Sequence, residues 1–203
     1  MKMKRGIIVA SMLLGAACGT CAVAEGVSIF KTPELEEKIL SFHRDRLARW
    51  PVPFEEVYVE TCYGPTHVII SGPKVAPPLV LIPAMGVGGT MWQPNVRALG
   101  GRYRVYAVDT IGDLGLSRLY DLKRHPKSGK DYSDWLTDVF DGLGIGRAEL
   151  VGASMGGWIV MNHAIHAPDR VGRIALLGPM GIRANLGVLS RLFWVVLFPT
   201  PRN

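Results

Sequence analysis

The stretch ELVGASMGGWIVMNHA, residues 149–164, decides the fold of this chain. It places Ser154 between an apolar run and a helical one, with Gly152 and Gly156 on either side. A serine on a tight strand-to-helix turn forms a nucleophile elbow, where larger flanking side chains would collide with neighbouring backbone. The same pentapeptide also occurs by chance, and the alternative is a simple helix start with Ser154 as N-cap.

The surrounding segments favour the elbow, because strand and helix patterns alternate along the chain. Apolar strand-like runs cover 79–86, 103–109, 148–154 and 173–181, and helical patterns between them cover 92–99, 131–144 and 155–166. Such alternation predicts an α/β fold, with a mostly parallel sheet covered by helices on both faces. In these sheets the working residues gather at the carboxyl ends of the strands, which is where Ser154 lies.

Two further elements are expected before this alternating region. Residues 32–51 read as an amphipathic helix, with Thr32 as its cap and Pro33 at its first position. Residues 55–64 and 66–72 read as two strands around the turn signal Gly64-Pro65, which predicts an N-terminal antiparallel hairpin.

The composition is that of an ordinary globular protein. The chain has 203 residues, of which 48% are hydrophobic and 20% charged, enough for one domain with a sizeable core. The net charge of +6 includes Lys2, Lys4 and Arg5, and the rest of the chain has 20 basic against 17 acidic residues without a basic cluster. This balance argues against a nucleic-acid partner.

The first residues have the layout of a secretory signal peptide. A basic start precedes an apolar segment, Gly6–Ala17, and Ala22 and Ala24 flank Val23 as in an A-x-A cleavage site. We therefore expect a signal peptide over residues 1–24, and an exported domain over 25–203 in the periplasm, the cell envelope or the medium.

Two alternatives for this segment stay open. Cys18 follows LLGAA and is a candidate for lipid attachment, although Gly15 stands where a lipoprotein signal usually has a larger aliphatic residue. The segment could also remain as an uncleaved anchor, but its apolar run is short for a membrane span. After cleavage only Cys62 would remain, so no internal disulfide is expected.

Taken in order, the segments LVLIPAMGVGGTMW, YRVYAVDTIGDLGLS, LVGASMGGW and HAPDRVGRIALLGP resemble the α/β-hydrolase superfamily, especially its bacterial carboxylesterase-like members. The resemblance runs from about Trp50 to the final strand. It implies that Ser154 attacks an acyl carbon, with an acid and a histidine completing a triad later in the chain. Serine at the elbow points to acyl transfer rather than to the aspartate chemistry of epoxide or halide relatives.

The chemistry also needs donors for the tetrahedral oxyanion. One would be the backbone N–H of Met155, at the positive end of a helix. The resemblance places the second at the backbone of Met85, although the usual His-Gly pair before it is replaced by Pro83-Ala84. The alternative is that residues 84–89 form a loop without chemical consequence.

The segment DTIGDLGLS is another departure from the family pattern. It has one residue more between Gly112 and Gly115 than relatives commonly have, which reshapes a loop near the mouth of the site. Asp109 ends its strand and is a candidate acid, but a turn-forming aspartate that binds backbone N–H groups is the favoured interpretation.

No histidine of the chain fits the role of base. A helix rises about 1.5 Å per residue, so His163 lies roughly 13 Å along the helix from Ser154, and His166 lies further away. His43 and His67 are expected at surface or packing positions. His125, in a polar loop, remains the one candidate that could move.

The acid is equally hard to find. The only carboxylate after Ser154 is Asp169, in a loop that in the family lies at the opposite end of the sheet. The run at 184–203 is strongly apolar, and we expect it to begin a lid or cap. The sequence therefore predicts a hydrolase domain truncated at its C-terminus, without the last strands, the acid and the histidine.

Two functions follow from these observations. The first is a serine hydrolase that acts on a carboxylic ester or similar small acyl substrate through an acyl-enzyme. The second is an inactive truncated hydrolase, or a binding module that keeps the sheet but lacks the base. No metal-ligand cluster, phosphate loop or dinucleotide fingerprint is found in the sequence, so no cofactor and no metal are expected. No stable membrane span is expected in the mature form, and the oligomeric state stays open.

Overall fold

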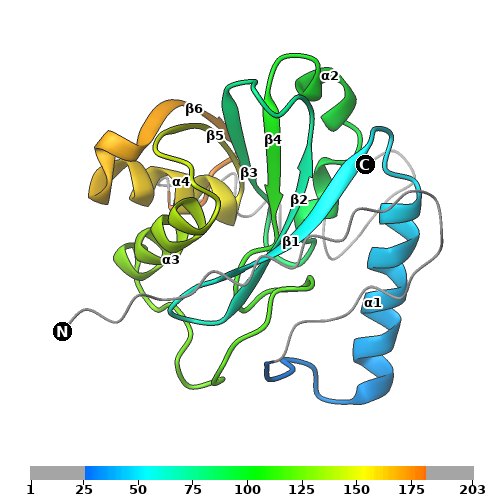
Figure 1. The fold of residues 1–203 in the computed structure, drawn as a ribbon. Helices are drawn as coiled ribbons and strands as arrows, with labels where there is room; N and C mark the ends of the chain where they lie inside the picture. The colour runs from blue at the N-terminus through cyan, green and yellow to red at the C-terminus, as the bar shows by residue number, and fades with distance from the viewer. Residues whose placement is uncertain (1–25, 182–203) are drawn as a thin grey trace, which may run out of the picture.

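A computed structural model describes residues 26–181, and its centre is a six-stranded sheet (Figure 1). The strand order is β1-β2-β4-β3-β5-β6. The strands are β1 (Phe54–Glu60), β2 (Pro65–Ser71), β3 (Pro78–Ile82), β4 (Arg104–Val108), β5 (Ala148–Ala153) and β6 (Val171–Leu177). The helices are α1 (Pro33–Ala48), η1 (Gly89–Trp92), α2 (Val96–Gly100), α3 (Gly129–Gly142), α4 (Met155–His166) and η2 (Pro168–Arg170).

The sheet is parallel from β4 to β6 and antiparallel at its N-terminal edge. β3 pairs in parallel with both β4 and β5, and β5 pairs in parallel with β6. β1 and β2 form the expected hairpin, and β2 pairs antiparallel with β4. The predicted α/β class, the mostly parallel sheet and the N-terminal hairpin are therefore confirmed.

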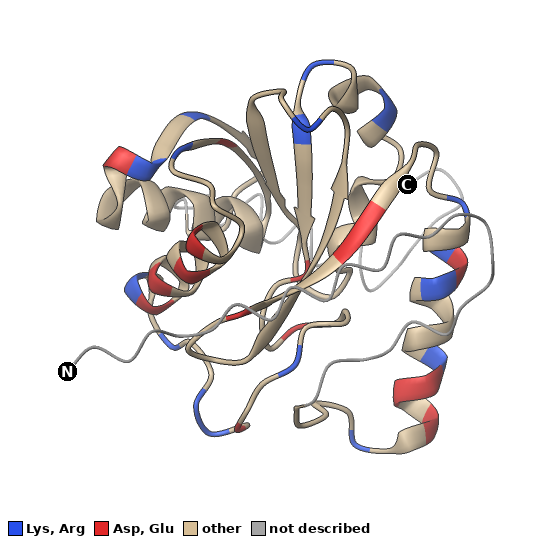
Figure 2. Ribbon diagram, in the orientation of Figure 1, with Lys and Arg blue, Asp and Glu red and all other residues tan. Residues whose placement is uncertain are grey.

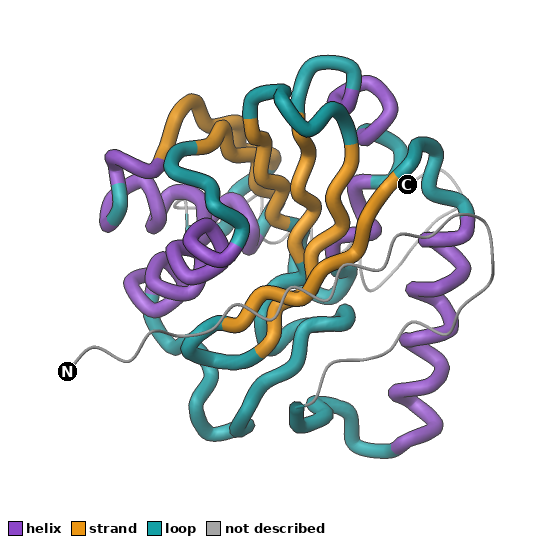
Figure 3. The backbone as a smooth tube through the Cα atoms, in the orientation of Figure 1, coloured by secondary structure: helices purple, strands orange, loops and turns teal. Residues whose placement is uncertain are grey.

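Helices cover both faces of the sheet, as Figure 3 shows most simply. α3 and α4 pack on one face through a cluster that includes Trp135, Phe140 and Ile159. α1, η1 and α2 lie on the other face, where Leu47 and Trp92 join a second cluster. A parallel sheet needs cover on both faces because its central strands are apolar throughout, and β3 is buried along most of its length.

α1 begins at the cap that the sequence predicts, whereas α3 begins at a cap that the sequence analysis did not name. The Thr32 hydroxyl accepts a hydrogen bond from the Leu35 N–H at the start of α1. α3 begins two residues earlier than expected because Ser128 and Asp131 form a capping box.

The helix expected over residues 92–99 is wrong as a single element. The chain forms the short η1 before Pro94 and the short α2 after it. Proline has no N–H to donate and its ring clashes with the preceding turn, so a continuous helix through this position would be interrupted.

The remaining expectations on organisation fall mainly outside the described residues. The signal peptide over 1–24, Cys18 and the apolar segment 184–203 lie there and stay predictions. Within 26–181, no helix is long and apolar enough to cross a membrane. Lys and Arg are scattered over several helices and loops (Figure 2), which agrees with the absence of a basic cluster in the sequence.

Candidate active site

Ser154 lies on a strained turn between β5 and α4. Its backbone has φ 51° and ψ −115°, and it is the only non-glycine residue with positive φ in the part of the chain that the structure describes. Such a conformation costs on the order of 1–3 kcal/mol and is typical of functional sites. Ser154 occupies the N-cap position, but its hydroxyl accepts no hydrogen bond from the helix, so it is not a simple cap.

The two flanking glycines are required by the close approach of backbone atoms. A Cβ atom on Gly152 would lie 2.4 Å from the Gly156 carbonyl oxygen. A Cβ atom on Gly156 would lie 2.3 Å from the Ile82 carbonyl oxygen. Because both neighbours are backbone, neither contact can be relieved by a side-chain movement, which confirms the sequence argument for small residues here.

The turn is fixed to the end of the neighbouring strand β6. The Ser154 N–H donates to the Leu177 carbonyl at 2.9 Å, and the Ser154 carbonyl accepts from the Met180 N–H at 2.9 Å. These bonds hold the strained backbone, so the half-exposed Ser154 side chain is presented at the carboxyl end of the sheet.

The two candidate oxyanion donors lie at the same end of the sheet as Ser154. Met155 is the first residue of α4, and Met85 follows β3, whose Ile82 pairs with Gly152 of β5. Among residues 26–181, neither the Met155 nor the Met85 N–H donates a hydrogen bond to another backbone group. Their role as oxyanion donors stays a prediction.

Asp109, the candidate acid, is a buried structural residue. Its carboxylate accepts hydrogen bonds from the N–H groups of Gly89 and Leu116, and it contacts His67. Burial raises the pKa of Asp109, but the charges of His43 and His67 and these hydrogen bonds hold it well below its usual range. The interpretation as a turn-forming aspartate is confirmed.

His67 joins two carboxylates inside the protein. Its Nδ1 lies 3.0 Å from Asp109 Oδ2, and its Nε2 lies 2.9 Å from Glu56 Oε1. Burial alone would lower the pKa of His67, but the hydrogen bonds and charges of the two carboxylates raise it to about 9. His67 is therefore the cation of a buried ion network, which the sequence analysis did not identify.

His43 completes this network from α1. Its ring is buried, its Nε2 lies 3.9 Å from Asp109 Oδ2, and desolvation lowers its pKa. In the described part of the chain, His43, His67 and Asp109 are the one group close enough to share a metal ion. Both His67 nitrogens and the Asp109 carboxylate have hydrogen-bond partners in this arrangement.

The histidines and the carboxylate after Ser154 lie away from it, as expected. His163 is buried against Ser133, 3.1 Å from its hydroxyl, and desolvation lowers the pKa of His163 to about 4. His166 is the exposed last residue of α4, and Asp169 is exposed in η2 just beyond it. All three lie toward the end of α4 opposite Ser154.

A pocket of about 540 Å³ adjoins the turn. It is lined by His125, Pro126, Lys127, Tyr132, Met155, Trp158, Met180 and Gly181. The Tyr132 and Trp158 rings meet edge to face at 5.7 Å and give the pocket an aromatic wall. His125 lies in this pocket, but its Nδ1 is 3.1 Å from the Leu122 carbonyl rather than bonded to Ser154.

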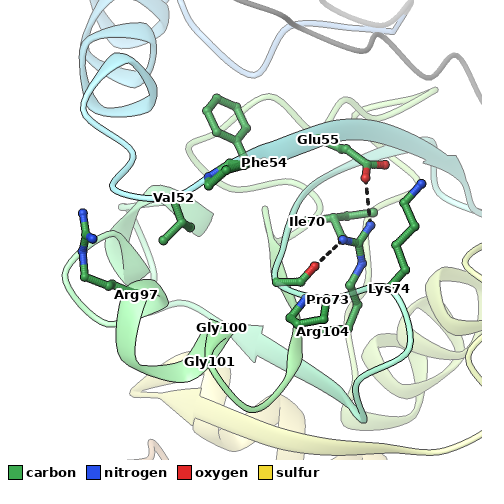
Figure 4. A pocket seen from close by; sticks show the side chains of 12 residues that line it. Val52, Phe54, Glu55, Ile70, Pro73, Lys74, Arg97, Gly100, Gly101 and Arg104 are labelled. Carbon is green, nitrogen blue, oxygen red and sulfur yellow. Dashed lines mark hydrogen bonds and ion pairs between the residues drawn. The ribbon is translucent and has the colours of Figure 1, made fainter.

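A second pocket, of about 670 Å³, lies away from these residues (Figure 4). Residues near the start of β4 and the end of β2 line it. This is the amino-terminal end of the parallel strands, whereas Ser154 lies at their carboxyl end. Arg104 in its wall donates to the Gly72 carbonyl at 2.7 Å and to Glu55 at 3.0 Å. Its cation is thus already paired, and this pocket is separate from the candidate active site.

Comparison with known proteins gives the family. The alpha/beta hydrolase fold family matches residues 77–197, more than half of the chain, so the chain belongs to this family. The carboxylesterase nap of Bacillus subtilis is 37% identical over 182 residues, which cover 81% of this chain and 60% of that protein. Carboxylesterase YbfK of the same organism is 41% identical over 133 residues, covering 66% and 44%.

A solved structure agrees with this assignment. The naproxen esterase of Bacillus subtilis is 36% identical, has a TM-score of 0.70, and is matched over 78% of this chain and 55% of its own. The chain thus spans about half of the length of these relatives. The family and the carboxylesterase relatives support enzyme status by family, as the sequence resemblance predicted.

Proposed function

We propose that this protein hydrolyses carboxylic esters through an acyl-enzyme, with Ser154 as the nucleophile. The observation that supports this best is the strained φ of 51° at Ser154, between two glycines whose positions tolerate no Cβ. Backbone strain of this kind persists only where the surroundings enforce it, and it is found mostly where function requires it. The carboxylesterase names of two relatives agree with this chemistry.

In the proposed reaction the Ser154 hydroxyl attacks the acyl carbon of the ester. Its proton passes to a base, and the carbonyl oxygen becomes an oxyanion that accepts hydrogen bonds from the Met155 and Met85 N–H groups. Collapse of this intermediate breaks the bond to the alcohol, which leaves with a proton. Water then attacks the acyl-enzyme in the same way, releases the acid and restores the serine.

The base is not identified among residues 26–181. No histidine or carboxylate of this part of the chain hydrogen-bonds to the Ser154 hydroxyl, and the family resemblance implies an acid and a histidine later than Ser154. Without a base, only the residual catalysis of an oxyanion site is expected.

The pocket beside Met155 supports a substrate with an aromatic or bulky apolar group. Tyr132 and Trp158 form one wall of it, and Met155 and Met180 add apolar surface next to the turn. One structural relative is a naproxen esterase, so an ester of an aryl acid is a reasonable first substrate.

The proposal is tested by comparing the rates at which the wild-type protein and Ser154→Ala hydrolyse an ester. We expect the wild-type protein to hydrolyse the 4-nitrophenyl ester of 2-phenylpropanoic acid, an aryl acid, and Ser154→Ala to lower the rate to the uncatalysed background. Ser41→Ala, an exposed position on α1, is the matched control and retains the rate. A fluorophosphonate probe should label the peptide that contains Ser154.

The non-enzymatic alternative makes the opposite prediction. If wild type and Ser154→Ala hydrolyse the ester at equal rates and the probe labels neither, the chain is a binding module or an inactive hydrolase. The carboxylesterase relatives do not favour that result.

A further inference from the structure

The loop between β4 and α3 contributes a second carboxylate, Asp113, that contacts the candidate oxyanion loop. Both Asp113 oxygens accept the Gly86 N–H, at 3.0 and 2.9 Å. Oδ1 also accepts the Leu114 N–H at 2.7 Å, which orients the carboxylate from its own loop. Asp113 lies between Gly112 and Gly115, where the sequence is one residue longer than the common family pattern.

The segment that contains Met85 needs such an anchor. Gly86 and Gly88 have φ values of 84° and 65°, so the loop uses two conformations that other residues rarely adopt. The Met85 side chain is 63% exposed and therefore contributes little packing to hold its own backbone. The far end of the loop is held by Asp109, which accepts the Gly89 N–H.

The bond to Gly86 limits the orientation of the Met85 N–H. The Gly86 N–H lies in the Met85–Gly86 peptide plane, and the Met85 N–H lies in the Ala84–Met85 peptide plane. The two planes meet at the Met85 Cα. The preceding residue is also held, since the Ala84 N–H points to Met91 Sδ at 3.4 Å. The peptide that carries the Met85 N–H therefore lies between two peptides that are each held by a hydrogen bond.

We propose that Asp113 is a positioning residue that holds the Met85–Gly86 peptide so that the Met85 N–H is ready for the oxyanion. This inference rests on the proposed function of Ser154. Asp113 itself touches neither the substrate nor the reacting atoms, and it acts through the backbone of Gly86.

The charge of Asp113 gives the anchor a pH dependence. Burial raises the pKa of Asp113, the N–H groups of Gly86 and Leu114 lower it, and the nearby Asp109 charge raises it again, so the net pKa lies above its ordinary value. The other titratable group that couples to it is Tyr132, whose own pKa is raised by burial and by the Asp113 charge. An ionised carboxylate is the stronger acceptor, so the anchor weakens as the pH falls through this raised pKa.

Paired variants test the proposal by ester hydrolysis. We expect Asp113→Ala to lower kcat by about 10- to 100-fold with little change in KM, since a misplaced oxyanion donor affects the transition state. Asp113→Asn keeps one acceptor oxygen for Gly86 and should recover kcat to within about fivefold of wild type. Asp113→Asn should also remove the fall in kcat at low pH that the protonation of Asp113 causes. Asp121→Asn, an exposed position in the same loop, is the control that leaves kcat unchanged.

The amide resonance of Gly86 provides a readout that does not depend on hydrolysis. In wild type its ¹⁵N-edited NMR signal should shift with the titration of Asp113, and in Asp113→Asn this titration should disappear. An unchanged Gly86 signal in Asp113→Ala overturns the proposal, as does a wild-type kcat in a protein whose hydrolysis depends on Ser154. If Ser154→Ala retains the wild-type rate, the proposed function fails and the positioning role fails with it. The Gly86 titration would then still report the hydrogen bond from the Gly86 N–H to Asp113.

Discussion

The Ser154 turn and the buried network around Asp109 lie at the same end of the sheet but are built in opposite ways. Ser154 follows β5 and Asp109 follows β4, with β3 between these strands. Ser154 is a partly buried residue that combines a strained backbone with a hydroxyl that caps nothing. Asp109 is fully buried, and both its oxygens are bonded. The first region presents the proposed nucleophile on a strained turn, whereas the Asp109 and His67 side chains of the second are held by hydrogen bonds.

This difference shows that a strongly shifted pKa does not by itself locate the active site in this protein. Perturbed titratable groups often mark functional sites, but structural ion networks perturb pKa values as well. Here the largest shifts fall on Asp109, His67 and His163. Asp109 and His67 join β2 to β4 and to the loops at Gly89 and Leu116, and His163 lies toward the end of α4 opposite Ser154. The proposed nucleophile Ser154 is marked instead by its strained backbone.

The largest effect that can test this comparison is the removal of the Asp109 carboxylate. We expect Asp109→Ala to lower the free energy of unfolding by about 3–5 kcal/mol, because it removes one of the two carboxylate partners of the buried His67 cation and leaves the Gly89 and Leu116 N–H groups without their acceptor. Urea denaturation followed by fluorescence of the tryptophans measures this change.

Asp134→Ala provides the matched control. Asp134 pairs with Lys130 on the exposed surface of α3, where an ion pair contributes about 0–1 kcal/mol. If Asp109→Ala instead unfolds like wild type and only ester hydrolysis is lost, the comparison fails and Asp109 belongs to the catalytic machinery.

Most of the fold could be predicted from the sequence because its signals are local. Apolar runs and turn residues marked every strand of the sheet, a cap at Thr32 marked α1, and an apolar pattern marked α3. The prediction over residues 92–99 was wrong because the helical pattern runs across Pro94, where the structure has a break between η1 and α2. The elbow could be predicted because the two glycines and the serine lie within five residues.

The buried network could not be predicted because it depends on pairing between distant segments. His67 and Asp109 are 42 residues apart and become opposite neighbours only when β2 pairs with β4. His43 comes from a helix on another part of the chain. The one signal in the sequence was that His67 lies inside an apolar strand. Without knowledge of the strand order, this position indicates a packed histidine as readily as a member of an ion network.

The second test, with an effect of intermediate size, measures how the free energy of unfolding changes with pH because of His67. The pKa of His67 is about 9 in the folded protein and about 6.5 when unfolded. Its contribution to stability is therefore fully present below about pH 6.5 and is lost as the pH rises toward 9. We expect the free energy of unfolding to fall by on the order of 1–3 kcal/mol over this range.

His67→Gln should remove this slope, because glutamine stays neutral at both pH values. His43 has the opposite shift, so its contribution is lost as the pH falls and does not produce the alkaline slope. Urea denaturation of wild type and variant at pH 6.5, 7.5 and 9 gives the comparison. Parallel pH profiles for the two proteins would show that His67 is not the cation of the network.

The smallest expected effect concerns the strain at Ser154. Glycine adopts positive φ readily, so Ser154→Gly should relieve the strain and raise the free energy of unfolding by about 1 kcal/mol, after allowance for its greater freedom when unfolded. Ser154→Ala keeps a Cβ atom in the same backbone conformation and should show no such gain. Both variants lose the nucleophile, so their difference in stability reports the backbone alone. Equal stability of the two would mean that the turn stores no strain, and the contrast between the strained Ser154 turn and the hydrogen-bonded Asp109 and His67 side chains would lose its energetic basis.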